Sequence, residues 1–116
     1  PEGTRSKDGR LNKGYPGIVL LAIRSGVPIL PAVFYGNENF SSNLKSLRRT
    51  HMVIKVGELF HVNFGTERMT KDLREEVTSE IMYQIAKLLP PEYRGLYADL
   101  SQVSTRHLVF SASNLN

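Results

Sequence analysis

The sequence predicts an α/β fold in which a mixed sheet is flanked by helices. Three observations support this prediction. A short helical segment is followed at once by a dense apolar run of strand length, two shorter β-like runs come next, and a long segment with helical periodicity closes the pattern. The 116 residues are 41% apolar and 22% charged, a composition that fits one soluble globular domain.

The first predicted helix covers residues 16–25 and follows a polar, basic loop over residues 1–14. Pro16 suits the first helical turn, Arg24 suits the last turn, and Gly26 stands where a helix-ending glycine is favoured. The middle of this segment is apolar all round, so we expect burial on more than one side.

The first predicted strand covers residues 28–35, between Gly26 and Gly36. Its dense apolar composition predicts an inner strand. Pro31 lies in its middle and cannot donate a hydrogen bond to a neighbouring strand, which favours a sheet edge or a bulge at that point. Residues 36–51 are polar and predict a long connection with at most one helical turn.

Two more short strands are predicted over residues 52–56 and 59–64, and Gly57 separates them. The strongest local prediction is a helix over residues 70–89, with Thr70 as its N-cap. Its apolar residues share one face at helical spacing: Leu73, Val77, Ile81, Ile85 and Leu88. Two prolines then end the helix, and residues 91–116 predict a weakly patterned C-terminal tail.

Composition excludes several classes of function. The 15 lysines and arginines exceed the 11 aspartates and glutamates, which gives a net charge of +4. This modest excess, scattered aromatic residues and the absence of a recognition motif argue against nucleic-acid binding. There is no cysteine, and hence no disulfide or thiolate chemistry. No glycine-rich nucleotide loop occurs, and no apolar run approaches the roughly 20 residues of a membrane-spanning helix.

The opening string Pro1-Glu2-Gly3-Thr4-Arg5-Ser6 combines groups suited to an anion. Arg5 offers a planar fork of donors that fits phosphate, and Gly3 allows backbone amides to approach a ligand closely. Glu2 can brace the arginine or accept a substrate hydroxyl. Taken by themselves, the same six residues are explained better by a solvated surface loop with one ion pair.

Two blocks together resemble the glycerolipid acyltransferases, above all the 1-acyl-glycerol-3-phosphate acyltransferases. The first is the opening string with Asp8-Gly9-Arg10-Leu11 and Lys13, and the second is Gly26-Val27-Pro28-Ile29-Leu30-Pro31 with Gly36. Their order and spacing agree with the family over roughly the first 36 residues, which is far more specific than one short motif. The resemblance implies a glycerol-phosphate acyltransferase-like α/β fold, of which this chain holds the C-terminal part over residues 1–90.

The resemblance also implies roles for individual residues. Arg5 would contact the phosphate of the acceptor, while Gly3 and Thr4 shape the loop and Glu2 supports it. Lys13 would add a second cation. The second block would be structural, and its residues are Val27, Pro28 and Pro31. The two prolines suit packing near the site rather than catalysis.

The catalytic pair of the family, a histidine followed five residues later by an aspartate, does not occur in this sequence. His51, His61 and His107 have Val56, Thr66 and Ala112 at that position. Each histidine is most simply a surface or strand residue, and their wide separation predicts no metal-ligand cluster. The chain opens at Pro1, inside the first block, where the family has a preceding phenylalanine. We therefore expect a fragment that is inactive alone.

The function implied for the parent protein is transfer of a fatty acyl group to 1-acyl-glycerol 3-phosphate, which gives phosphatidic acid. The donor would be acyl-CoA or acyl carrier protein, with no metal and no organic cofactor. We expect the parent at the cytoplasmic face of a membrane. The basic residues Lys45, Arg48, Arg49 and Lys55 could face anionic phospholipid, and a solvated loop explains them at least as well. The uncovered edges of such a fragment predict oligomerisation when it is made alone.

Three alternatives remain at the level of the sequence. The chain could be a non-catalytic module that binds anionic lipid or phosphate through Arg5, Lys7, Arg10 and Lys13. It could also be an acyltransferase-like domain with a structural or interaction role in a larger protein. A related enzyme that acts on another acceptor, such as glycerol 3-phosphate, fits the same residues.

Overall fold

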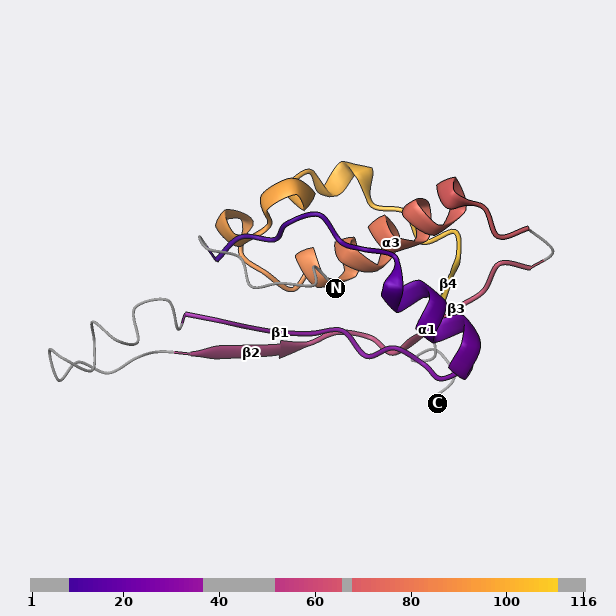
Figure 1. The fold of residues 1–116 in the computed structure, drawn as a ribbon. Coiled ribbons are helices and arrows are strands. Elements are labelled where there is room, and N and C mark those ends of the chain that lie inside the picture. Colours follow the sequence, from indigo (N-terminus) through magenta and orange to yellow (C-terminus); the bar gives the residue numbers. More distant parts are fainter. Residues whose placement is uncertain (1–8, 37–51, 66–67, 111–116) are drawn as a thin grey trace, which may run out of the picture.

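A computed structural model describes residues 9–36, 52–65 and 68–110 of the chain. Two α-helices and four short strands are present in these ranges: α1 (Gly17–Ser25), β1 (Ala32–Tyr35), β2 (Val53–Val56), β3 (Phe60–Val62), α3 (Lys71–Ala86) and β4 (Leu108–Phe110). Three short 3₁₀ turns lie between α3 and β4. Figure 1 shows α3 and these turns as a layer on one side of the strands, with α1 beside them.

The described strands form two separate antiparallel pairs, β1 with β2 and β3 with β4, in place of the predicted mixed sheet. The α/β composition is therefore confirmed, and the mixed sheet is wrong for this part of the chain. Strand β2 runs antiparallel to β1, and β4 runs antiparallel to β3, so the described strands contain no parallel pair. A single bridge between Ile29 and Phe60 links the segment before β1 to β3.

The predicted strand over residues 28–35 is interrupted at Pro31. Ile29 pairs with Phe60, whereas β1 begins at Ala32 and pairs with β2. The carbonyl of Pro31 still accepts a 2.8 Å hydrogen bond from the Gly57 N–H, so the chain bends there without losing an acceptor. This agrees with the bulge or edge expected at a proline.

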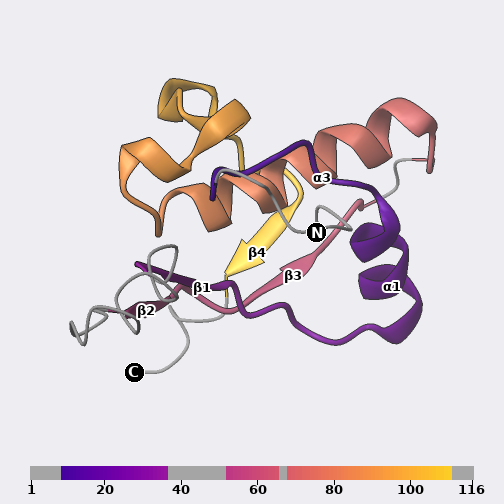
Figure 2. The same ribbon diagram turned by 60° about the vertical axis from the view of Figure 1, so that its left-hand side comes forward.

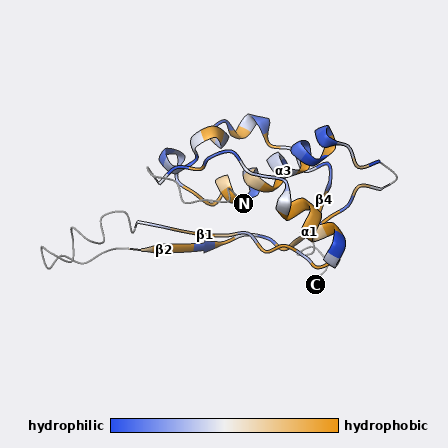
Figure 3. Cartoon of the chain, viewed as in Figure 1, coloured by the Kyte–Doolittle hydropathy of each residue, from blue (hydrophilic) through white to orange (hydrophobic). Residues whose placement is uncertain are grey.

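The β1–β2 ribbon exposes one of its faces, which corrects the expectation of an inner strand. Phe34 and Ile54 are cross-strand partners on that face and are 62% and 72% exposed. The opposite face carries the buried Val33. Figure 3 shows hydrophobic residues along this ribbon, which lies apart from the helical layer.

Helix α1 packs through one face only. Val19 and Ala22 are buried, but Leu21 is 62% exposed, so the expected burial on more than one side is wrong. The helix ends as predicted, because Gly26 adopts a left-handed conformation with φ 66° and donates its N–H to the Ala22 carbonyl.

Helix α3 is the centre of the fold, and its predicted start is confirmed. The Thr70 hydroxyl oxygen accepts a 3.1 Å hydrogen bond from the Leu73 N–H. The predicted apolar face supplies half of the buried residues of the main core, where α3 meets α1, β3 and β4. The buried residues of this core are Val19, Phe60, Leu73, Val77, Ile81 and Leu108.

Residues 91–110 are part of the predicted C-terminal tail, and they contribute to both hydrophobic core clusters of the described chain. Tyr97 is buried against Met82 and Ala86 of α3, and Leu108 of β4 joins the main core. Figure 2 shows β4 lying beside β3 under the helical layer. Strand β4 and the three 3₁₀ turns are not predicted from the sequence, because the hydrophobic periodicity of this segment is weak. The domain boundary at residue 90 stays a prediction.

Candidate functional site

Four of the five predicted substrate-binding residues, Glu2, Gly3, Thr4 and Arg5, lie outside the described residues. The fifth, Lys13, belongs to the extended loop over residues 9–16 that precedes α1. This residue is exposed and lies in a loop whose backbone is fixed on both sides of it.

Two hydrogen bonds from backbone N–H groups and the close packing of Gly14 against Met82 hold this loop in place. The Leu11 N–H donates to the Tyr93 carbonyl at 3.0 Å, and the Gly14 N–H donates to the Tyr97 hydroxyl oxygen at 3.0 Å in a buried contact. A Cβ at Gly14 would stand 2.6 Å from Cγ of Met82, so this position admits no side chain without movement of α3 residues. Lys13 therefore projects from a loop held directly against α3.

A cavity of about 400 Å³ opens beside Lys13. This volume lies in the range of small-ligand pockets. Lys71, at the first turn of α3, lines the same cavity, although no sequence pattern pairs it with Lys13. The remaining lining residues come from the loop, from α3 and from a 3₁₀ turn: Gly14, Tyr15, Pro16, Glu75, Thr78, Ser79 and Tyr97.

The charges of this cavity favour an anion. The lining includes two lysines, four residues with a hydroxyl group and one acidic residue, Glu75. Glu75 follows Lys71 by one helical turn, a spacing at which opposite charges attract. The lysines act as compact point charges, so they suit a phosphate group in varied orientations, and Glu75 weakens that attraction. We call this cavity the lysine pocket.

The residues of the predicted structural block have different environments. Pro31 is buried, and its ring lies close to Gly57. A Cβ at Gly57 would stand only 2.9 Å from Cγ of Pro31. Val27 and Pro28 are exposed, so packing accounts for one of the two prolines only. None of the three lines the lysine pocket.

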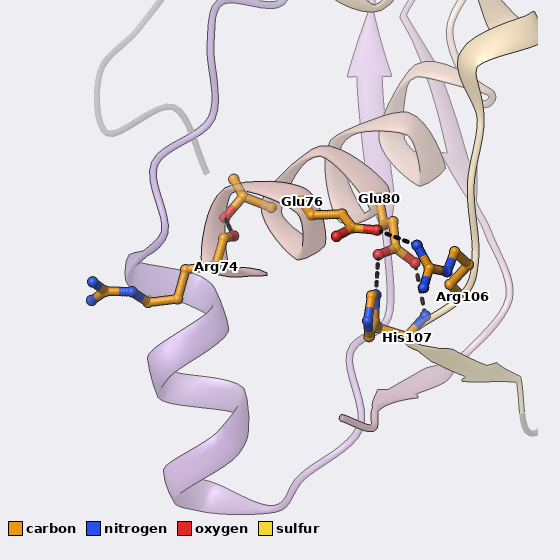
Figure 4. A network of polar contacts seen from close by, with 6 residues as sticks. Arg74, Glu76, Glu80, Arg106 and His107 are labelled. Atoms are coloured by element: carbon orange, nitrogen blue, oxygen red, sulfur yellow. Dashed lines mark hydrogen bonds and ion pairs between the residues drawn. The ribbon is translucent and has the colours of Figure 1, made fainter. Parts of the chain in front are cut away.

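A buried carboxylate and imidazole pair is a second polar centre, which the sequence reasoning missed. Glu80 of α3 is 1% exposed and His107, just before β4, is 4% exposed. The His107 N–H donates to Oε1 of Glu80 at 2.9 Å, and Nδ1 of His107 lies 2.6 Å from Oε2 (Figure 4). His107 is therefore a buried, paired residue, in place of the expected surface or strand histidine.

An exposed ion pair adjoins this buried contact. Nη1 of Arg106 lies 3.1 Å from Oε1 of Glu76, and both side chains reach solvent. Figure 4 shows the two pairs side by side, with both glutamates on α3 and both partners on the segment before β4. The signal in the sequence was Glu76 and Glu80, four residues apart on one helix, with Glu80 next to the apolar stripe.

The other predicted histidine and basic residues give no further centre in the described ranges. His61 is an exposed residue of β3, in agreement with a strand position, and His51 lies outside the described residues. Lys55 places its ammonium 5.8 Å from the ring centre of Tyr35. Lys45, Arg48 and Arg49 lie outside the described residues. In the described ranges no helix combines the length and apolar character needed to cross a bilayer.

Fold and site thus define a small α/β protein with a basic pocket and a buried carboxylate and imidazole pair. Comparison with curated proteins finds a 36-residue segment that is 50% identical to a 1-acyl-sn-glycerol-3-phosphate acyltransferase, BAT2, chloroplastic, of Brassica napus. This segment is 31% of the present chain and only 10% of that relative. No known family profile matches the chain. No solved structure matches it either.

The short match agrees with the resemblance seen in the two sequence blocks. It is a similarity to one short segment of an acyltransferase. The specific fold of those enzymes is not established by two small antiparallel sheets and two helices.

Proposed function

We propose that this chain is the acceptor-binding part of an acyltransferase that acts on 1-acyl-glycerol 3-phosphate. The match to the Brassica napus enzyme carries the proposal, because its name specifies this acceptor. The lysine pocket also supports it. Lys13, proposed from the sequence as a phosphate ligand, lines a cavity together with a second lysine.

The charge of the acceptor determines which side chains can bind it. Its phosphate carries one to two negative charges at neutral pH and presents oxygens that accept from ammonium, guanidinium and hydroxyl donors. Lys13 and Lys71 supply the charge in the described part of the site, and Arg5 would add the bidentate contact. The pocket size suits a glycerol phosphate head group, with the acyl chain outside it.

The chemical step belongs to the parent enzyme. In this proposal a histidine base outside this chain activates the acceptor hydroxyl, which attacks the carbonyl of an acyl thioester. The thiolate of acyl-CoA or acyl carrier protein leaves, and the product is phosphatidic acid. A lipid acceptor also implies action at a membrane surface, which forms part of the same proposal.

The test is binding of sn-glycerol 3-phosphate to the full chain by titration calorimetry. Lys13→Ala and Lys71→Ala should each weaken binding about tenfold or more, since a bond to a charged group contributes about 1.5–3 kcal/mol. Glu75→Gln should strengthen binding, because it removes the opposing carboxylate. Lys87→Ala is the matched control, an exposed lysine that follows α3 and is not part of the lysine pocket.

Equal losses in Lys87→Ala and Lys13→Ala would contradict the site, because they would show attraction to net charge alone. The alternative function, a non-catalytic phosphate or anionic-lipid module, predicts the same calorimetry. It differs in the parent protein, which would then show no acyl transfer to 1-acyl-glycerol 3-phosphate.

A further inference from the structure

Three potential ligand atoms converge where α3 meets the segment before β4. They are carboxylate oxygens of Glu76 and Glu80 and a ring nitrogen of His107, all within 4.8 Å of one another. Glu80 and His107 are buried, and Glu76 lies at the solvent boundary. Two carboxylates and one imidazole form a donor set that transition-metal dications accept.

We propose that Glu76, Glu80 and His107 form a binding site for a divalent transition metal ion such as Zn²⁺. This metal cluster is separate from the lysine pocket and does not depend on the proposed acyltransferase function. None of its three residues lines that pocket.

The fold has already fixed the two buried ligands. Oε1 of Glu80 is held by the His107 N–H, which leaves Oε2 facing Nδ1 at 2.6 Å. Oε1 thus fixes the orientation of the Glu80 carboxylate, and Oε2 points toward the imidazole. A hydrogen bond outside the metal site orients metal ligands in the same way in known metal centres.

When the metal ion binds, it replaces one proton. The contact between Nδ1 and Oε2 contains a proton shared by the two groups. A metal ion takes the place of that proton, which is released to solvent, and the ion then binds Nδ1 and Oε2 directly. The two carboxylates neutralise its double charge in a site where a buried charge otherwise needs a partner.

The required movement is small. Two ligands of one tetrahedral zinc ion, each about 2.1 Å from it, stand about 3.4 Å apart, so Nδ1 of His107 and Oε2 of Glu80 must separate by about 0.8 Å from their present 2.6 Å. The three atoms here are within 4.8 Å, and the partly exposed Glu76 side chain can supply the adjustment. His107 and Arg106 also line a pocket of about 280 Å³ together with Val109 and residues 63–65, so this pocket borders the His107 side of the metal cluster.

Arg106 provides the sharpest consequence of this proposal. Its guanidinium already lies on Glu76 at 3.1 Å, so a cation occupies part of the space where the metal would sit. The arginine side chain is 69% exposed and can swing away. Arginine and metal therefore compete for Glu76, and removal of the arginine should raise the affinity for metal.

The test is titration of Zn²⁺ into the untagged, chelator-treated full chain at pH 7.5, followed by calorimetry. We expect one ion per chain. Glu76→Gln should weaken binding at least tenfold, and Arg106→Gln should strengthen it severalfold. His107→Asn should abolish it, provided that circular dichroism shows a folded variant. Glu58→Gln and His61→Asn are the matched controls, because each changes an exposed residue of the same type outside the metal cluster and the lysine pocket.

Because Glu76 and Arg106 are exposed, their variants test the proposal even if the variants of the buried pair do not fold. A titration without saturable binding overturns the proposal and leaves the metal cluster as a purely structural ion pair. Binding that Glu76→Gln leaves unchanged, or that His61→Asn abolishes, overturns it as well. Mg²⁺ should bind far more weakly than Zn²⁺, because imidazole is a poor ligand for it.

Discussion

The contact between Glu80 and His107 makes a quantitative prediction about stability. It joins two side chains that are 1% and 4% exposed, so water cannot replace either partner. His107→Leu removes the imidazole, keeps the backbone N–H and leaves a buried carboxylate with a single donor. The loss of one partner of such a pair costs about 3–5 kcal/mol of the free energy of unfolding.

Glu80→Gln should cost less than His107→Leu. The amide oxygen of glutamine can still accept from the His107 N–H, so only the charge-assisted contact to Nδ1 is lost, a cost of about 1.5–3 kcal/mol. The double variant Glu80→Leu with His107→Leu should cost less than the sum of its single variants, because no unpaired charge remains.

Urea denaturation followed by circular dichroism measures these differences. Arg106→Gln is the internal comparison, since it removes an ion pair whose side chains are 69% and 41% exposed and should cost at most about 1 kcal/mol. A cost for His107→Leu no larger than that for Arg106→Gln would refute the reasoning. Additive costs in the double variant would also refute it.

Four other predictions concern separate parts of the chain. Arg5→Ala should weaken binding of sn-glycerol 3-phosphate about 10- to 150-fold, and Arg5→Lys should restore only part of the loss, as measured by calorimetry. Thr70→Ala removes the N-cap of α3 and should lower the free energy of unfolding by about 1 kcal/mol in urea denaturation. Gly95→Ala should abolish cooperative unfolding in a thermal melt, since φ is 56° there and a Cβ would stand 2.1 Å from the Leu11 carbonyl oxygen. Burial, together with the Asp99 charge, raises the pKa of the Tyr83 hydroxyl. The neutral hydroxyl therefore contributes to stability fully below about pH 10, and this contribution is lost as the pH rises through the pKa of Tyr83 in the folded protein. A Tyr83→Phe variant should therefore lose less stability than the parent chain in denaturation series between pH 9 and 11.5, and equal losses would count against this reasoning.

Local signals in the sequence predicted the helices well. Thr70, Gly26 and the stripe from Leu73 to Ile81 act within a few residues, so hydrogen bonding and periodicity reveal them directly. Strand pairing depends on partners far along the chain, and this is where the prediction failed. The antiparallel partner of β3 is β4, which lies 46 residues later at the pair Val62 and Leu108 and has no alternating pattern.

The same distinction applies to the candidate sites. Lys13 was identified because it lies next to a short motif, whereas Lys71 is 58 residues away and enters the pocket only through the packing of the loop on α3. Glu80 and His107 are 27 residues apart, and neither carries a local signature of a partner. A buried polar pair becomes visible only after the fold has excluded water from both groups.

The central claim is that Lys13 and Lys71 hold the phosphate of a glycerol phosphate acceptor. Its most direct test is an amide NMR titration of the full, uniformly labelled chain with sn-glycerol 3-phosphate, and with glycerol as the neutral comparison. We expect saturable shifts at Lys13, Gly14 and Lys71 with the phosphate and none with glycerol. Shifts confined to other basic residues, or equal shifts with both compounds, would contradict the claim.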